Sequence, residues 1–183
     1  PAGVFNLVHG DGPTVGAAIS SHPDVAMVSF TGSTRAGVEV SRAAAPGIKR
    51  VTLELGGKSP NLVFADCDLE KRIAESVAEC FDNTGQSCNA PTRMRVRRAL
   101  HAQVVEIACE VAAQVCFDDS QPATAIGPVA NAMQFKRVQQ LIGQAVAEGA
   151  LLVAGGVGRP DGIARGFYVK PTIFADVDPL GVI

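Results

Sequence analysis

The chain has 183 residues, of which 47% are hydrophobic and 19% are charged, and its formal net charge is −2. This balance is typical of a globular protein, and the lack of a basic stripe argues against nucleic acid and anionic membrane surfaces as partners. No run approaches the roughly 20 apolar residues that a membrane-spanning helix needs, so we expect no such helix.

The first part of the chain alternates between apolar, strand-like runs and helix-forming segments. Strands are predicted over residues 4–8, 25–30 and 50–55, and helices over residues 14–20 and 35–45. A Pro-Gly pair follows the second helix and is expected to end it. Strands that alternate with helices indicate βαβ units and a parallel sheet, so the sequence predicts an α/β fold.

The remainder of the chain continues this alternation. The predicted helices cover residues 68–81, 100–115 and 131–148, and the predicted strands cover residues 61–64, 93–97 and 151–154, followed by extended chain over 168–174. Polar or glycine-rich loops are expected over residues 83–91, 118–128 and 155–166. In the helix predicted over 68–81 the apolar side chains recur at helical spacing, which predicts a buried face formed by Leu69, Ile73, Val77 and Phe81.

The cysteines and histidines give no sign of a metal centre. No two of the five cysteines form a C-x-x-C pair, and the three histidines are far apart in the sequence. We therefore expect neither a zinc site nor a disulfide framework, and a reducing, cytoplasmic compartment is favoured.

Cys88 differs from the other cysteines in its sequence surroundings. It lies in a loop of small polar residues, whereas Cys80 and Cys109 fall on predicted helices among apolar neighbours. Exposed backbone N–H groups in such a loop can stabilise a thiolate and then an oxyanion, which makes Cys88 a candidate nucleophile. The residues alone leave the alternative open, and an ordinary loop cysteine is the commoner case.

Glu54 is the candidate general base. It ends a β-rich run and is followed almost at once by the pair Gly56 and Gly57. A carboxylate placed there would be partly desolvated, which suits a general base. The alternative is an edge-strand glutamate that lies in water.

Residues 30–34 combine a strand end, a glycine turn and a helix start. That arrangement presents free N–H groups and the positive end of a helix, which together form a site that can bind a phosphate. Ser33 could be a phosphate ligand, or it could serve only as the N-cap of the helix.

Three motifs occur in the order and near-spacing of aldehyde dehydrogenases: F-T-G-S at 30–33, L-E-L-G-G-K-S-P at 53–60 and G-Q-S-C at 85–88. Further matches to that family are G-P at 127–128, E-G-A at 148–150, G-G at 155–156 and P-T-x-F at 171–174. The sequence resembles this family across essentially its whole length, and the second and third motifs are highly specific as a pair.

The resemblance implies oxidation of a small-molecule aldehyde to a carboxylic acid with NAD or NADP. The Cys88 thiolate would add to the aldehyde, and the Cys88 backbone N–H would supply half of the oxyanion hole. Glu54 would activate the water that hydrolyses the resulting thioester. Relatives that pass the acyl group to CoA generally lack this base, so hydrolysis to a free acid is expected.

The resemblance also implies which residues contact the cofactor. Gly32 and Ser33 would face the pyrophosphate and the nicotinamide side, while Gly12 and Pro13 would border the adenine pocket. The Leu55 backbone would lie near the carboxamide of the nicotinamide.

Three residues near Cys88 occupy places that help to line the substrate tunnel in relatives, namely Asp82, Ser87 and Asn89. Asp82 would favour a polar or cationic aldehyde if its carboxylate points into the tunnel. The alternative for Asp82 is that it points to solvent.

The family's subunits are more than twice as long as this chain, so we expect a partial aldehyde dehydrogenase fold. Residues 1–56 would be the C-terminal part of a Rossmann-like NAD(P)-binding domain, and residues 57–183 a truncated catalytic domain. The full-length protein would be a homo-oligomer, a dimer or a tetramer. A second hypothesis is that the 183 residues alone are a folded, non-catalytic fragment that lacks essential cofactor-binding and oxyanion-hole segments.

Overall fold

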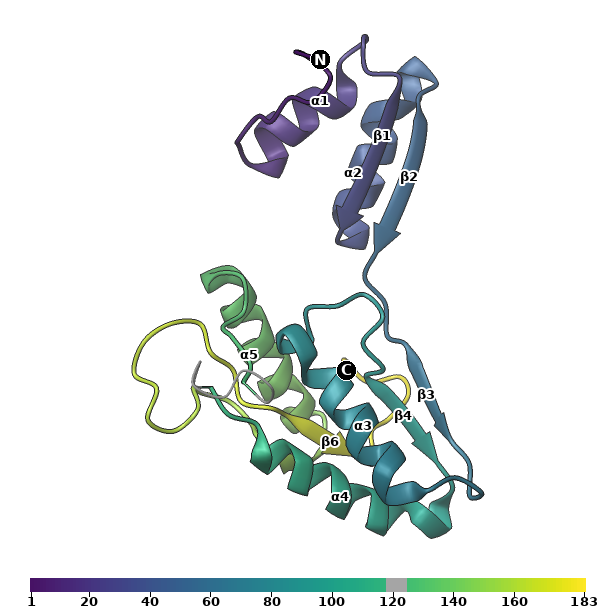
Figure 1. Ribbon diagram of the computed structural model, residues 1–183, viewed down its shortest axis with the longest axis vertical. Helices are drawn as coiled ribbons and strands as arrows, with labels where there is room; N and C mark the ends of the chain where they lie inside the picture. The colour runs from purple at the N-terminus through teal and green to yellow at the C-terminus, as the bar shows by residue number, and fades with distance from the viewer. Residues whose placement is uncertain (118–124) are drawn as a thin grey trace. The chain divides into compact units, whose positions relative to one another are not determined.

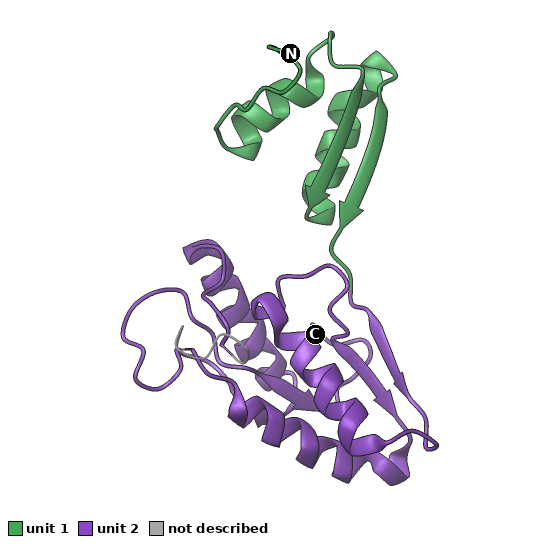
Figure 2. Ribbon diagram, in the orientation of Figure 1, with its two compact units in different colours: residues 1–57 green, residues 58–183 purple. Residues whose placement is uncertain are grey.

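The computed structural model describes residues 1–117 and 125–183, which divide into two compact units (Figures 1 and 2). Unit 1 is Pro1–Gly57 and unit 2 is Lys58–Ile183. Both units combine helices with parallel strand pairs, so the predicted α/β fold is confirmed. Most of the loop predicted over 118–128 lies outside the described residues.

Unit 1 contains one parallel strand pair and two α-helices. Its elements are a π-helical turn Gly12–Gly16, α1 Ala17–Ser21, β1 Met27–Gly32, α2 Thr34–Ala44, a 3-10 turn Ala45–Gly47 and β2 Arg50–Leu55. The strands pair in parallel from Met27 opposite Arg50 to Gly32 opposite Leu55. Figure 1 shows α2 alongside both strands, as a helix that connects parallel strands requires.

Gly37 allows α2 to lie close to β2. A Cβ added at Gly37 would lie only 2.8 Å from Cδ2 of Leu55, so any larger residue would force the helix or the leucine to move. The contact holds the second strand of unit 1 against its helix.

The strand predicted over residues 4–8 is wrong. These residues are irregular, and the side chains of Val4, Phe5, Leu7 and Val8 are between 64% and 83% exposed. A strand forms by pairing with a neighbour, and among the described residues this segment has no strand beside it. An apolar run alone therefore did not suffice to predict a strand here.

The described part of unit 2 contains the longer helices and four short strands. Its elements are β3 Pro60–Val63, α3 Leu69–Phe81, a 3-10 turn Asp82–Gly85, β4 Arg93–Val96, a 3-10 turn Arg98–Leu100, α4 His101–Gln114, α5 Ala132–Ala147, β5 Leu151–Ala154 and β6 Ile173–Ala175. β3 and β4 pair in parallel, and β5 and β6 pair antiparallel.

The core of unit 2 lies between α3 and α4. Ile73 and Val77 of α3 pack with Val104, Ile107 and Ala108 of α4, and all five side chains are at most 9% exposed. The buried face predicted for the helix over 68–81 is thus confirmed, with Leu69 and Phe81 partly buried against the same cluster. This core fixes the C-terminal end of α3, from which the loop with Cys88 departs.

The antiparallel pair β5 and β6 departs from the parallel arrangement predicted for the whole chain. The connection over residues 155–172 contains no helix. A parallel return needs a crossover connection, usually a helix, whereas a loop lets the chain reverse directly.

No helix of the described residues is long and apolar enough to cross a membrane.

Candidate active site

Cys88 lies at the tip of an exposed turn that follows α3. The chain leaves the helix through three successive residues with left-handed backbone angles, Asn83, Thr84 and Gly85, with φ of 48°, 58° and 69°. The N–H of Ala90 then donates to the carbonyl of Ser87 at 3.3 Å, which closes a turn around Cys88. Cys88 is exposed, so reagents can reach its thiol from solvent.

Two side chains connect this turn to a segment more than 40 residues later. The Thr84 hydroxyl donates to the carbonyl of Gly127 at 2.8 Å, and the Ala130 N–H donates to Oε1 of Gln86 at 2.8 Å. The G-Q-S-C and G-P motifs therefore meet in the fold. No local pattern in the sequence connects these two motifs.

The thiols of Cys80 and Cys109 are bonded to backbone carbonyls of unit 2. The Cys80 thiol donates to the Pro91 carbonyl at 3.0 Å, and Sγ of Cys109 lies 3.4 Å from the Val153 carbonyl. Burial, with a smaller effect of the Glu79 carboxylate, raises the pKa of the Cys80 thiol to about 11. Both side chains are half-buried, and their bonds agree with the structural role expected for them.

The residues predicted to line the substrate tunnel surround Cys88 in sequence and differ in exposure. Ser87 is half-buried, whereas Asp82 and Asn89 are exposed. Ser87 and Asn89 flank Cys88 within its turn, and Asp82 begins the 3-10 turn at the end of α3.

Glu54 and Leu55 lie at the carboxyl ends of the strands of unit 1. Thr31 is opposite Glu54 and Gly32 is opposite Leu55, so Gly32, Glu54 and Leu55 share one edge of the parallel pair. Ligands of open parallel sheets bind at this edge. The Glu54 side chain is exposed in unit 1, and the partial desolvation expected for its carboxylate stays a prediction.

Ser33 caps α2 at the same edge. Its Oγ accepts a hydrogen bond from the Ala36 N–H at 3.2 Å, which confirms the N-cap interpretation. An oxygen that accepts this bond still has its own hydrogen to donate to a phosphate. The N–H groups of α2 that precede Ala36 have no partner within the helix, which leaves donors for an anion.

Gly12 and Pro13 begin the π-helical turn before α1, and both are exposed. The Asp11 side chain caps this turn, since its Oδ1 accepts from the Thr14 hydroxyl and from the Thr14 N–H, the latter at 2.8 Å. These two bonds hold the pKa of Asp11 below its usual range. No heavy atom lies within 4 Å of where a Cβ on Gly12 would be, so this glycine leaves open space.

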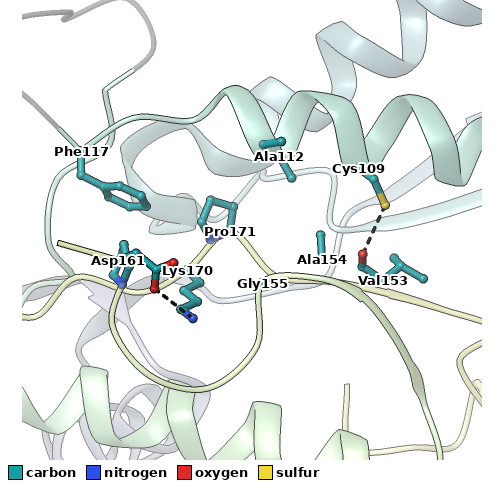
Figure 3. Close-up of a pocket in the computed structure, with 11 residues that line it drawn as sticks. Cys109, Ala112, Phe117, Val153, Ala154, Gly155, Asp161, Lys170 and Pro171 are labelled. Atoms are coloured by element: carbon teal, nitrogen blue, oxygen red, sulfur yellow. Dashed lines mark hydrogen bonds and ion pairs between the residues drawn. The ribbon is translucent and has the colours of Figure 1, made fainter. Parts of the chain in front are cut away.

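A hollow of about 480 Å³ lies on unit 2 between α4, β5 and the loop that precedes β6 (Figure 3). Its lining includes Cys109, Phe117 and the pair Lys170 and Asp161, whose Nζ and Oδ1 atoms are 3.9 Å apart. None of the residues predicted for catalysis or cofactor binding lines this hollow. The thiol of Cys109 points to the Val153 carbonyl.

Comparison with known proteins agrees with the motifs and the fold. The 3-succinoylsemialdehyde-pyridine dehydrogenase of a Pseudomonas species is 52% identical over 179 residues, which are 97% of this chain and 38% of that protein. The crystal structure of aldehyde dehydrogenase from Bartonella henselae is 47% identical with a TM-score of 0.92, and the match covers 99% of this chain and 38% of that one.

A second solved structure, a mutant of aldehyde dehydrogenase C from Pseudomonas syringae in complex with NAD+ and octanal, is 49% identical with a TM-score of 0.93. That match covers 97% of this chain and 37% of the other. The chain thus spans little more than a third of the length of the relatives that it matches. The model that describes the aldehyde dehydrogenase family matches residues 1–183, so the chain belongs to the aldehyde dehydrogenase family.

Proposed function

We propose that the protein containing this chain oxidises an aldehyde to a carboxylic acid with NAD+ or NADP+, using Cys88 as the nucleophile and Glu54 as the general base. The observation that carries the proposal is the exposed turn that presents Cys88, within a motif that resembles the family's. Relatives named as aldehyde dehydrogenases, one of them solved with NAD+ and octanal, support it.

The proposed reaction runs through a covalent intermediate on Cys88. The thiolate adds to the aldehyde carbon, and the Cys88 backbone N–H donates to the oxyanion that forms. NAD+ or NADP+, held by Gly32 and Ser33 when bound, would supply the acceptor for the hydride that leaves this carbon. Glu54 then takes a proton from a water molecule that attacks the thioester carbon, and Cys88 leaves as a thiolate.

The residues predicted for the cofactor fit a dinucleotide in their chemistry. Gly32 has no side chain to obstruct the exposed start of α2, and Ser33 keeps a hydrogen to donate to a phosphate oxygen. We assign Leu55 to the nicotinamide side of the site, and Gly12 and Pro13 to the adenine side. In this proposal residues 1–56 belong to the NAD(P)-binding domain and residues 57–183 to the catalytic domain.

The proposal names the substrate class, aldehydes, and no individual aldehyde. We assign Asp82, Ser87 and Asn89 to the path by which the aldehyde reaches Cys88, because the resemblance implies this role. Ser87 and Asn89 flank Cys88, and Asp82 begins the 3-10 turn that precedes it. The homo-oligomer and the cytoplasmic location expected from the sequence stay predictions.

The first test is formation of reduced nicotinamide by the purified protein, with a panel of aldehydes and with NAD+ and NADP+ in turn. Turnover that Cys88→Ala abolishes supports the proposal, and turnover that survives this substitution contradicts it. If a full-length protein turns over and the 183 residues alone do not, the second hypothesis holds for the isolated chain, which is then a non-catalytic fragment.

A further inference from the structure

The loop that carries Cys88 is bonded to a second loop rather than held only by its own turn. Oε1 of Gln86 accepts from the Ala130 N–H at 2.8 Å, while Nε2 of the same side chain donates to the Asn83 carbonyl at 3.2 Å. One amide group thus joins the start of the loop to residue 130. Gln86 is two residues from Cys88, so its position restricts that of the thiol.

Thr84 forms a second connection. Its hydroxyl donates to the Gly127 carbonyl at 2.8 Å. Its backbone has φ of 58° and ψ of 31°, a conformation that is rare for a β-branched residue and that persists only where surrounding contacts enforce it. The bond to Gly127 is one such contact.

The segment that receives these bonds, residues 126–130, is itself fixed to unit 2. The Ile126 N–H donates to the Cys116 carbonyl at 2.9 Å, and the Val129 N–H donates to the Phe167 carbonyl at 3.0 Å. The Val129 side chain is only 4% exposed. Gln86 and Thr84 therefore connect the Cys88 loop by hydrogen bonds to a segment that is itself bonded to and buried in unit 2.

We infer that Gln86 and Thr84 are positioning residues that hold the Cys88 turn in the geometry needed for attack on the aldehyde. This inference rests on the proposed function of Cys88. Neither side chain is assigned a contact with substrate or cofactor, so both act through the loop. A nucleophile displaced by about 1 Å can cost roughly 100-fold in rate, whereas binding of aldehyde and cofactor is unaffected.

The variants are chosen to remove one bond set at a time. Gln86→Met and Thr84→Val remove the hydrogen bonds and nearly keep the side-chain volume, while Thr84→Ser keeps the hydroxyl. The matched control is Gln139→Met on α5. The Gln139 side-chain amide also makes two hydrogen bonds to backbone: it accepts from the Gly158 N–H and donates to the Gly158 carbonyl at 3.4 Å. The full-length protein is used throughout.

Two readouts decide the inference. The first is kcat per folded protein, with the folded fraction isolated by size-exclusion chromatography, together with KM for aldehyde and nicotinamide. The second is amide hydrogen exchange over residues 86–90, which reports the order of the turn without any need for turnover.

Gln86→Met and Thr84→Val are expected to lower kcat per folded protein by about 10- to 100-fold and to leave both KM values within about twofold. Exchange over residues 86–90 should accelerate in both variants, and Thr84→Ser and Gln139→Met should resemble the parent. Unchanged kcat and exchange in the two variants, or an equal loss in Gln139→Met, would overturn the inference. Failure of the proposed function is separate, because it appears as turnover that persists in Cys88→Ala.

Discussion

At the scale of single residues, Cys88 and Glu54 are assigned different steps, and their substitutions should therefore fail differently. Glu54→Gln removes the base that activates water, so steady-state turnover should fall by about 100-fold or more. The earlier hydride transfer should survive, giving one burst of reduced nicotinamide per Cys88 thiol in stopped-flow measurements. Glu39→Gln is the control, because Glu39 is an exposed carboxylate of unit 1 that pairs with Arg42 on α2. Loss of the burst in Glu54→Gln would assign Glu54 to an earlier step.

Cys80 should make stability depend on pH in the alkaline range. Burial raises the pKa of its thiol from 9.0 to about 11, so the folded chain keeps a proton that the unfolded chain loses. The stabilising effect is fully present below about pH 9, declines above it and is lost near pH 11. Urea unfolding of the parent and of Cys80→Ala measures this pH dependence. The difference between their free energies of unfolding should shrink from about pH 9 to about pH 11. A constant difference would contradict it.

At the scale of elements, Gly155 should be decisive for the turn that leaves β5. Its φ is 75°, and a Cβ there would lie 2.1 Å from the Pro171 carbonyl oxygen, which is backbone and cannot simply rotate away. Gly158 is a matched control in the same loop, because its φ is 99° and nothing lies within 4 Å of its Cβ position. Gly158→Ala should cost about 1 kcal/mol from backbone strain, and Gly155→Ala about 3 kcal/mol or more, measured by denaturant unfolding. If both substitutions lower the free energy of unfolding equally, the backbone near Gly155 moves to accommodate the Cβ, which contradicts the prediction.

The elements that the sequence predicted well are those specified by local signals. α3 and α5 begin after Asp68 and Asn131, whose side chains cap them, and α5 ends before Gly149 with φ of 91°. Strands depend on distant partners, which is why the strand expected over residues 4–8 is missing and the direction of β6 was not foreseen.

The candidate site divides in the same way. The loop of Cys88 and its motif are local, and the sequence placed them correctly between α3 and β4. The bond between Gln86 and Ala130 joins residues 44 apart, so no local pattern reveals it. The exposure of Glu54 depends on which other parts of a protein surround the strand, and the pattern of β2 says nothing about them.

At the scale of the whole molecule, unit 1 contains a small sheet and leaves apolar side chains uncovered. It contains two paired strands, and several of its large apolar side chains are exposed, among them Phe5, Met27 and Ile48. The chain covers 38% of its relative of 52% identity. Both observations predict that the 183 residues alone bind NAD+ poorly, since a dinucleotide site needs more of a sheet than one strand pair.

The isolated chain should consequently separate the two halves of the proposed chemistry. Transfer of an acyl group from an activated aryl ester to a thiol requires no cofactor and depends on Cys88 of unit 2, whereas aldehyde oxidation also requires a bound nicotinamide. We expect a burst of aryl alcohol equal to one per Cys88, measured by absorbance, and little or no reduced nicotinamide from any aldehyde. Cys88→Ala should abolish the burst, while alanine at Cys67, a half-buried cysteine of the same unit, should not. A burst that persists without Cys88 would exclude it as the nucleophile, and aldehyde turnover by the isolated chain would show that these residues suffice for the whole reaction.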